Sequence, residues 1–185
     1  MRIISGALKG KSINFVKNST TRPLKDSVKE NIFNILKHSK EVKIEIEKSN
    51  VLDLYSGVGS FGLECISRGA QEVTFVEQDK IALDILKKNL KHLSISDQAY
   101  IKNQKIEFYL KNCKKKFNIF FFDPPFADNN FKENLVLIKK NKNFFDKNIV
   151  VIHREKKNNE NFKNYINVIF AKNYGRSRII FGLFN

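Results

Sequence analysis

The sequence predicts an α/β protein built on a doubly wound, mostly parallel sheet. Two observations support this prediction. Short apolar runs between Asn50 and Ile152 have the length of buried strands. These runs alternate with stretches in which apolar residues recur at helical spacing. The chain has 185 residues, the usual size of one domain. We therefore expect a single domain over residues 1–185, with an α/β core in residues 50–185 and an N-terminal extension in residues 1–38.

The N-terminal extension is expected to hold a β-hairpin and a helix. Two β-prone pieces within residues 2–15 flank a turn that contains Gly6 and Gly10, as in a hairpin. Residues 17–22 are polar and predict a loop. A proline and an aspartate are then typical of a helix start, and apolar residues recur at helical spacing over residues 28–37.

The core elements follow from the same periodicities. Strands are expected at 51–54, 72–76, 99–101, 117–122 and 149–152. Helices are expected at 61–67, 81–93 and 131–139. Residues 167–171 and 179–184 are both β-rich and break the alternation, which predicts an antiparallel pair at one edge of the sheet. Residues 156–164 form the most polar stretch and are expected to be a mobile loop.

The charge balance favours a polyanionic partner. Lys and Arg number 34 against 19 Asp and Glu, a formal net charge of +15. Nucleic acid and an anionic membrane are both polyanions. No apolar run approaches the length that spans a bilayer, and no basic amphipathic helix with an aromatic face is evident, so we expect nucleic acid. The alternative is compositional, because Lys and Asn are abundant throughout the chain.

Location and redox chemistry follow from two further features. The first residues lack an apolar signal core followed by a cleavage site, so we expect a cytoplasmic protein. Cys65 and Cys113 lie far apart and form no metal-type pair with His38, His92 or His153. We expect two reduced thiols and no metal site.

A glycine-rich segment follows the first core strand. Residues 57–62, Gly-Val-Gly-Ser-Phe-Gly, match the pattern G-x-G-x-x-G between a strand and a helix. Glu77 ends the next strand, where a carboxylate can accept both hydroxyl groups of a ribose. On these features alone, a dehydrogenase with a nicotinamide cofactor is one interpretation.

Asp53 argues against a dinucleotide. It ends the first strand just before the glycines, where its carboxylate would repel a pyrophosphate. S-adenosylmethionine has no phosphate and carries an ammonium and a sulfonium, which a carboxylate attracts. Gly57 and Gly59 would then allow close approach of the backbone to the ligand. The segment therefore favours S-adenosylmethionine as the cofactor.

A second motif, Asp123-Pro124-Pro125-Phe126, follows the strand at 117–122. Ligands of open α/β sheets bind at the carboxyl ends of the strands, so this motif is expected beside the glycine loop. The Asp123 carboxylate and the Pro124 carbonyl could accept both N–H groups of an exocyclic amine and aim its lone pair at a methyl donor. Phe126 could stack on the base.

These two motifs resemble those of the class I amino-methyltransferases, whose signature is Asp/Asn-Pro-Pro-aromatic. Residues 2–6, Gly10-Lys11 and the run Arg-Pro-Leu-Lys-Asp-Ser-Val-Lys-Glu-Asn-Ile-Phe-Asn at 22–34 resemble the RsmD-type 16S rRNA (guanine-N2)-methyltransferases. The resemblance covers nearly the whole chain. The family usually has a second glycine at position 5, threonine at 24, and arginines at 27 and 29, where this chain has Ser, Leu, Ser and Lys.

The resemblance implies a Rossmann-like methyltransferase that modifies N2 of a guanine in 16S rRNA, acting on a 30S assembly intermediate. Nothing in the sequence demands a dimer, so we expect a monomer. The resemblance also implies that the extension binds RNA and covers the cofactor. The implied cofactor-binding residues are Asp53, Tyr55, Gly57, Gly59, Glu77, Asn103 and Asp123. The implied catalytic residues are Asp123, Pro124, Pro125 and Phe126. The candidate RNA-binding residues are Lys9, Lys11, Arg22 and Lys25.

Two alternatives stay open at this point. The same tetrapeptide would serve methylation of another exocyclic amine, such as adenine N6 in RNA or DNA. A non-catalytic RNA-binding assembly factor with a relic cofactor site is a different class, although the intact Asp53, Gly57, Glu77 and Asp123 speak against it.

Overall fold

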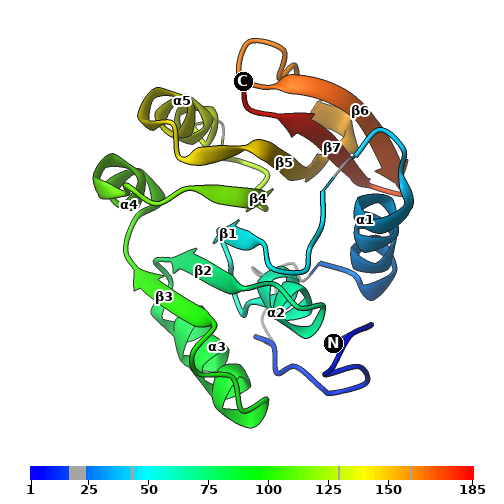
Figure 1. The fold of residues 1–185 in the computed structure, drawn as a ribbon, viewed down its shortest axis with the longest axis vertical. Coiled ribbons are helices and arrows are strands. Elements are labelled where there is room, and N and C mark those ends of the chain that lie inside the picture. The colour runs from blue at the N-terminus through cyan, green and yellow to red at the C-terminus, as the bar shows by residue number, and fades with distance from the viewer. Residues whose placement is uncertain (17–23, 43, 129, 159) are drawn as a thin grey trace.

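A single seven-stranded sheet organises the molecule, as a computed structural model shows (Figure 1). The structure describes residues 1–16, 24–42, 44–128, 130–158 and 160–185. The strands are β1 Asn50–Leu54, β2 Glu72–Glu77, β3 Ala99–Asn103, β4 Phe117–Phe122, β5 Phe144–Glu155, β6 Asn167–Tyr174 and β7 Ser177–Leu183. The helices are α1 Asp26–His38, α2 Ser60–Ser67, α3 Lys80–His92, α4 Ile106–Asn112 and α5 Lys132–Asn141, with a 3₁₀ turn at Lys156–Asn158.

The strand order β3-β2-β1-β4-β5-β7-β6 makes the sheet doubly wound. Strands β1 to β5 are parallel, and β7 pairs antiparallel with both β5 and β6. The chain moves outward from β1 to β3 and then returns to place β4 on the other side of β1. The carboxyl ends of β1 and β4 therefore form a topological switch point, where such sheets bind ligands. The expected fold class and the antiparallel C-terminal pair are confirmed.

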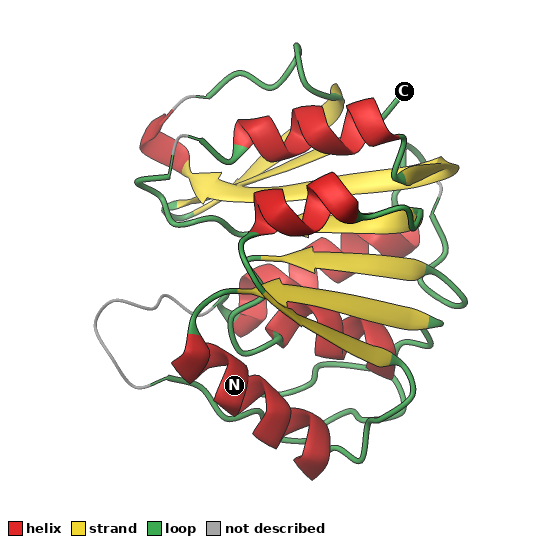
Figure 2. Ribbon diagram, turned by 90° about the vertical axis from the view of Figure 1, so that its left-hand side faces the viewer, coloured by secondary structure: helices red, strands yellow, loops and turns green. Residues whose placement is uncertain are grey.

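Two layers of helices cover the sheet (Figures 1 and 2). Helices α1, α2 and α3 bury one face, and α4 and α5 bury the other. Alternate side chains of β4 divide between the faces, so that Phe121 packs against Phe61 of α2 at 4.1 Å between ring centroids while Phe120 and Phe122 enter the other cluster. The central strands β1, β2 and β4 are buried along almost their whole length because both faces are covered.

The N-terminal extension forms a short hairpin, as expected. Its two arms meet at one antiparallel bridge, Arg2 to Ser12, and the N–H groups of Ile3 and Ile13 donate to the carbonyl oxygens of Lys11 and Met1 at 2.9 Å each. Helix α2 also holds its backbone: the carboxylate of Glu64 accepts the N–H groups of Ile4 and Ser5 at 2.7 and 3.0 Å. The expected loop at 17–22 lies outside the described residues.

A buried lysine joins this extension to the core. Lys29 of α1 is fully buried, and its ammonium lies 2.8 Å from the carbonyl oxygen of Arg2 and 3.8 Å from Glu64. Burial lowers the pKa of Lys29, and the neighbouring Glu64 carboxylate opposes that shift. Lys29, at a position where the family usually has arginine, therefore links α1 to α2 inside the protein. It is not exposed for contact with RNA.

The sequence periodicities missed α4 and shortened β5. Helix α4 is seven residues long and buries only Ile106, Tyr109 and Leu110, too few apolar positions to mark a helical period. Residues 156–164, expected to be mobile, are anchored in their described part: the Glu160 carboxylate pairs with Arg154 and Phe162 is buried. In the described residues, no helix has the length and apolar character needed to cross a bilayer.

Candidate active site

A large pocket of about 990 Å³ lies at the carboxyl ends of β1, β2 and β4. Among the described residues that line it, seven side chains are Asp or Glu and one is Lys. The carboxylates are Asp53, Glu77, Asp79, Glu107, Asp123, Asp128 and Glu133. An acidic pocket inside a chain of net charge +15 attracts a cationic ligand and repels phosphate.

Asp53 is the most deeply buried of these carboxylates, with 1% of its surface exposed. Its Oδ2 accepts the N–H of Gly62 in α2 at 2.9 Å, whereas Oδ1 is buried and has no hydrogen-bond partner among the described residues. Burial raises the pKa of Asp53 well above its usual range, and the nearby carboxylates of Asp123 and Glu77 add to the shift. An unpartnered, buried carboxylate oxygen beside the pocket fits a ligand that brings positive charge.

The glycine loop brings α2 close to the sheet. Gly59 begins α2 in the left-handed conformation, at φ 87°, and a Cβ there would lie 2.5 Å from Leu86 of α3. A Cβ on Gly62 would lie 2.3 Å from the Phe75 ring. Gly57 and its neighbour Val58 line the pocket, whereas Gly59 does not. Gly57 therefore faces the ligand space, and Gly59 serves helix packing.

Glu77 binds the backbone of the glycine loop from the end of β2. Its Oε2 accepts the N–H of Gly57 at 2.8 Å, and its Oε1 accepts the N–H groups of Gln78 and Asp79 at 2.9 Å each. A carboxylate oxygen can accept two hydrogen bonds, so Oε2, which accepts only one from the protein, retains capacity for a hydroxyl group of a ribose. The same side chain thus orders the loop and offers an acceptor to the pocket.

Tyr55 is held in a rare backbone conformation, at φ 59°. Its hydroxyl donates to Asp128 Oδ2 at 3.1 Å and accepts from the Asn134 amide of α5 at 3.0 Å. Burial raises the pKa of Tyr55, and the Asp128 carboxylate raises it further. The strained residue links the end of β1 to the loop after β4, which fixes the width of the pocket.

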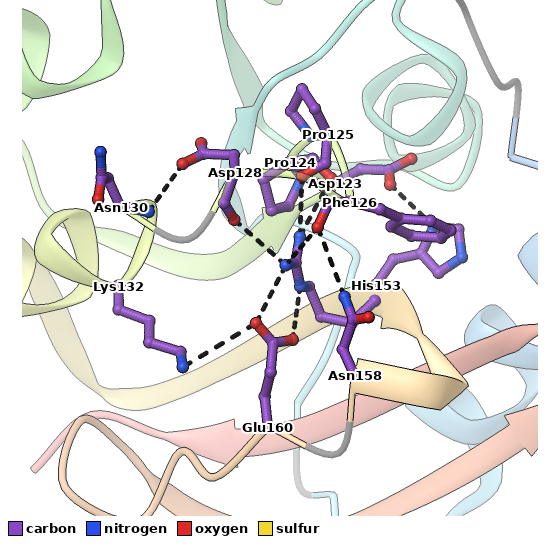
Figure 3. Close-up of polar contacts among 11 residues, drawn as sticks. Asp123, Pro124, Pro125, Phe126, Asp128, Asn130, Lys132, His153, Asn158 and Glu160 are labelled. Carbon is purple, nitrogen blue, oxygen red and sulfur yellow. Dashed lines mark hydrogen bonds and ion pairs between the residues drawn. The ribbon is translucent and has the colours of Figure 1, made fainter.

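Asp123 begins the loop after β4 and lines the pocket with 21% of its side chain exposed. Its Oδ1 lies 2.8 Å from Nδ1 of His153 on β5 (Figure 3). The described residues offer no partner to its Oδ2. One oxygen is therefore held by the protein, and the other can accept an N–H group from a substrate.

Arg154 holds the rest of the loop, residues 125–128, through hydrogen bonds to its backbone. It is 1% exposed, and its guanidinium donates to the carbonyl oxygens of Pro125 at 3.0 Å, Phe126 at 3.1 Å and Asp128 at 3.2 Å. Glu160 neutralises it through two contacts of 2.6 and 3.0 Å, so that the four groups converge on one cation (Figure 3). This cradle of acceptors fixes the loop, because a buried guanidinium is stable only when acceptors satisfy its N–H groups and balance its charge.

Pro124 and Phe126 complete the motif. The Pro124 carbonyl lies 3.5 Å from Arg154, a long contact that leaves it the least engaged of these carbonyls. Phe126 is half-buried, lines the pocket and meets His153 edge-on with 5.7 Å between ring centroids. The structure thus brings Asp123, Pro124 and Phe126 to one wall, opposite the glycine loop.

Asn103, an expected cofactor-binding residue, does not line the pocket. It is exposed, whereas Gln104, Lys105 and Ile106 line the pocket where β3 leads into α4. The geometry therefore favours the segment 104–107 over Asn103 as the wall for a nucleobase.

The predicted RNA-binding residues do not share one site. The turn that carries Lys9 and Lys11 packs against Ser67 at the C-terminal end of α2, about 12 Å along that helix from the pocket. Lys25 is exposed and caps α1 beside Leu24, which lines the pocket. Arg22 lies outside the described residues.

Sequence reasoning missed His153, Arg154, Glu160 and Ser177. From the sequence, His153 is considered only as a metal ligand, and the other three residues are assigned no role in the site. The available signal is the run His-Arg-Glu, which follows the apolar stretch at residues 149–152 at the carboxyl end of β5. That position lies next to the end of β4 in a parallel sheet.

The sheet order, the acidic pocket and the Asp-Pro-Pro-Phe loop together define a class I S-adenosylmethionine-dependent methyltransferase. The chain matches the family described as Conserved hypothetical protein 95 over residues 1–182 and belongs to it. Its relatives identify it more closely as an RsmD-type methyltransferase, as the sequence resemblance implied.

Curated relatives and a solved structure agree. The chain is 35% identical over 159 residues to Ribosomal RNA small subunit methyltransferase D of Haemophilus influenzae, covering 84% of this chain and 79% of that protein. The Escherichia coli protein of that name is 30% identical over 158 residues, covering 85% and 76%. The solved structure of Escherichia coli yhhF superimposes with a TM-score of 0.83 at 28% identity, covering 98% and 96%. The cofactor is therefore S-adenosylmethionine rather than a nicotinamide nucleotide.

Replacing Glu77 by Ala should lower the affinity for S-adenosylmethionine at least tenfold. The change removes charge-assisted hydrogen bonds, each typically about 1.5–3 kcal/mol, and frees the Gly57 N–H. Glu77→Gln keeps one acceptor oxygen and should lose less. Calorimetric titration measures both. Glu72→Ala, at the opposite end of the same strand, is the matched control and should bind normally. An unchanged affinity in Glu77→Ala would remove Glu77 from the cofactor site.

Proposed function

We propose that this chain transfers a methyl group from S-adenosylmethionine to N2 of a guanine in 16S rRNA. The observation that supports this most is the Asp123 carboxylate, held at one oxygen and available at the other, on the wall of an acidic pocket. The relatives named rRNA small subunit methyltransferase D support rRNA as the substrate.

The cofactor supplies a methyl group activated by a positively charged sulfur. In our proposal Asp53, Tyr55, Gly57, Glu77 and the segment 104–107 hold it, with Gly59 shaping the loop. The unpartnered Oδ1 of Asp53 and the surrounding carboxylates favour its positive charge. Burial raises the pKa of Asp53, and a bound cation opposes that shift by favouring the ionised carboxylate, to which it is attracted strongly where the local dielectric constant is low.

The motif Asp123–Phe126 acts on the amine. Asp123 Oδ2 and the Pro124 carbonyl accept its two N–H groups, which orients the nitrogen lone pair, and Phe126 stacks on the base. Pro125 keeps the loop stiff. The acidic lining repels phosphates, so the base enters the pocket while the RNA backbone stays outside, as in base flipping. We place this reaction in the cytoplasm, on a 30S assembly intermediate, by a single-domain monomer.

A methyl-transfer assay with labelled cofactor tests the proposal. Naked 16S rRNA and 30S assembly intermediates are compared, and the nucleosides are then analysed by mass spectrometry. We expect N2-methylguanosine and faster transfer to the intermediate. If the product is N6-methyladenosine, the target is N6 of an adenine rather than N2 of a guanine. Failure to transfer to any RNA, with the cofactor bound, would favour a non-catalytic assembly factor.

The binding of RNA should weaken steeply with salt because the contacts are made to phosphates. Each neutralised phosphate contributes about −0.7 to −0.9 to the slope of log affinity against log salt. Changing Lys9, Lys11, Arg22 and Lys25 together to Gln should flatten that slope and weaken the binding of related and unrelated RNA alike. Fluorescence anisotropy at several salt concentrations measures the slope.

The matched control removes the same charge elsewhere. Lys139, Lys140, Lys142 and Lys147 are exposed at the amino end of the sheet, opposite the pocket. Changing these four to Gln should leave the slope nearer to that of the wild type. Equal flattening in both quadruple variants would mean that net charge alone, and not the N-terminal extension, binds RNA.

A further inference from the structure

His153 lies next to the reactive motif without belonging to it. It is 2% exposed and sits on β5, one residue before Arg154. Its Nδ1 lies 2.8 Å from Asp123 Oδ1, and its Nε2 lies 2.9 Å from the Ser177 hydroxyl of β7. Both ring nitrogens of a buried imidazole are therefore engaged, one of them by the residue proposed to hold the substrate amine (Figure 3).

The chemistry of these groups fixes the direction of the hydrogen bonds. An ionised carboxylate only accepts, so Nδ1 carries the hydrogen in the contact with Asp123. Nε2 can then accept from the Ser177 hydroxyl, which holds the ring in one tautomer and one orientation. Ser177 is itself fixed, because it pairs with Glu155 in the register of β5 and β7.

This arrangement gives the two oxygens of the Asp123 carboxylate different roles. Oδ1 is held by His153, which stops the carboxylate from rotating and leaves Oδ2 for an N–H donor in the pocket. The same ring meets Phe126 edge-on, at an interplanar angle of 80°. One imidazole thus supports both the polar and the aromatic member of the motif.

We propose that His153, oriented by Ser177, is a positioning residue for methyl transfer that holds Asp123 so that its Oδ2 faces the target amine. The inference rests on the proposed function of Asp123. His153 acts through Asp123 and touches neither substrate nor cofactor. Its removal should therefore change the rate of transfer and leave the binding of S-adenosylmethionine intact.

The test compares variants that keep or remove the donor at the Nδ1 position. His153→Leu removes it and should lower kcat about 10- to 100-fold, the loss typical of removing a hydrogen-bond partner that orients a metal-ligating side chain, which is a comparable positioning role. His153→Asn places an amide N–H near the same point and should recover most of kcat. Ser177→Ala frees the ring at Nε2 and should give an intermediate loss. KM and cofactor affinity should change little in all three.

A matched control separates positioning from folding. Asn143 is also buried and donates to two backbone carbonyls, those of Cys113 and Lys115, at the far end of the sheet. Asn143→Leu should lower the melting temperature without lowering kcat. A loss of kcat in His153→Leu no greater than in Asn143→Leu, with similar melting temperatures, would overturn the proposal.

Two measurements address the coupling to Asp123. In a double-mutant cycle, His153→Leu should cost little further rate once Asp123 is Ala, and additive losses would overturn the proposal. Nitrogen-15 NMR of wild-type His153 should show hydrogen on Nδ1, and a ring with hydrogen on Nε2 alone would also overturn it. A wild-type enzyme that is active while His153→Leu is unimpaired refutes this inference alone. A wild-type enzyme that methylates no RNA refutes the proposed function with it.

Discussion

Asp123→Ala should lower the rate of methyl transfer by about 10²–10³-fold, the usual cost of losing one preorganised contact in a site that excludes water. The alanine removes the carboxylate that contacts His153 and lines the pocket. Binding of S-adenosylmethionine should stay near normal. Single-turnover rates with saturating cofactor measure the effect.

Asp123→Asn should remain measurably active, far above Ala. The amide can turn its oxygen to the amine only if its N–H₂ group faces Nδ1 of His153. The ring can accommodate this by carrying its hydrogen on Nε2, because the Ser177 hydroxyl can accept as well as donate. If Asn is as inactive as Ala, the negative charge itself is needed, for example to accept the amine proton after transfer, and the acceptor-only role is wrong.

Arg154→Met should lower the free energy of unfolding by about 3–5 kcal/mol, because it removes the 2.6 Å partner of the nearly buried Glu160 and leaves only Lys132, at 3.9 Å. It also leaves the carbonyls of Pro125, Phe126 and Asp128 without their donor, so the loop that carries Asp123 loses its support. The rate of transfer should therefore fall as well, even at temperatures where the variant is folded. Urea denaturation and single-turnover rates measure the two effects.

Arg176→Met is the matched control for this prediction. Arg176 also pairs with a glutamate, Glu155, but its side chain is 84% exposed. Water and salt screen such a pair, so the variant should be close to the wild type in stability. Equal stability losses in the two variants would mean that the Arg154 cradle contributes no more than a surface ion pair.

The sequence by itself determined the alternation of strands and helices, the glycine loop, and the positions of Asp53, Glu77 and Asp123 at strand ends. These features are local. A buried parallel strand needs a continuous apolar run, an amphipathic helix needs its period, and the residues that follow such strands must lie at one edge of the sheet. The expected hairpin is confirmed as a short one: its arms meet through backbone hydrogen bonds around one antiparallel bridge, and Glu64 of α2 accepts the N–H groups of Ile4 and Ser5, which no local pattern predicts.

Only the tertiary structure decided which polar side chains meet. His153 lies 30 residues from Asp123 and 24 from Ser177, and the contacts depend on the pairing of β4 with β5 and of β5 with β7. Strand register is set by long-range packing, and a shift of one residue would turn His153 to the opposite face of the sheet. The burial of Lys29 and Arg154 has the same origin: whether a cation is exposed or becomes an internal tie depends on the elements that pack over it.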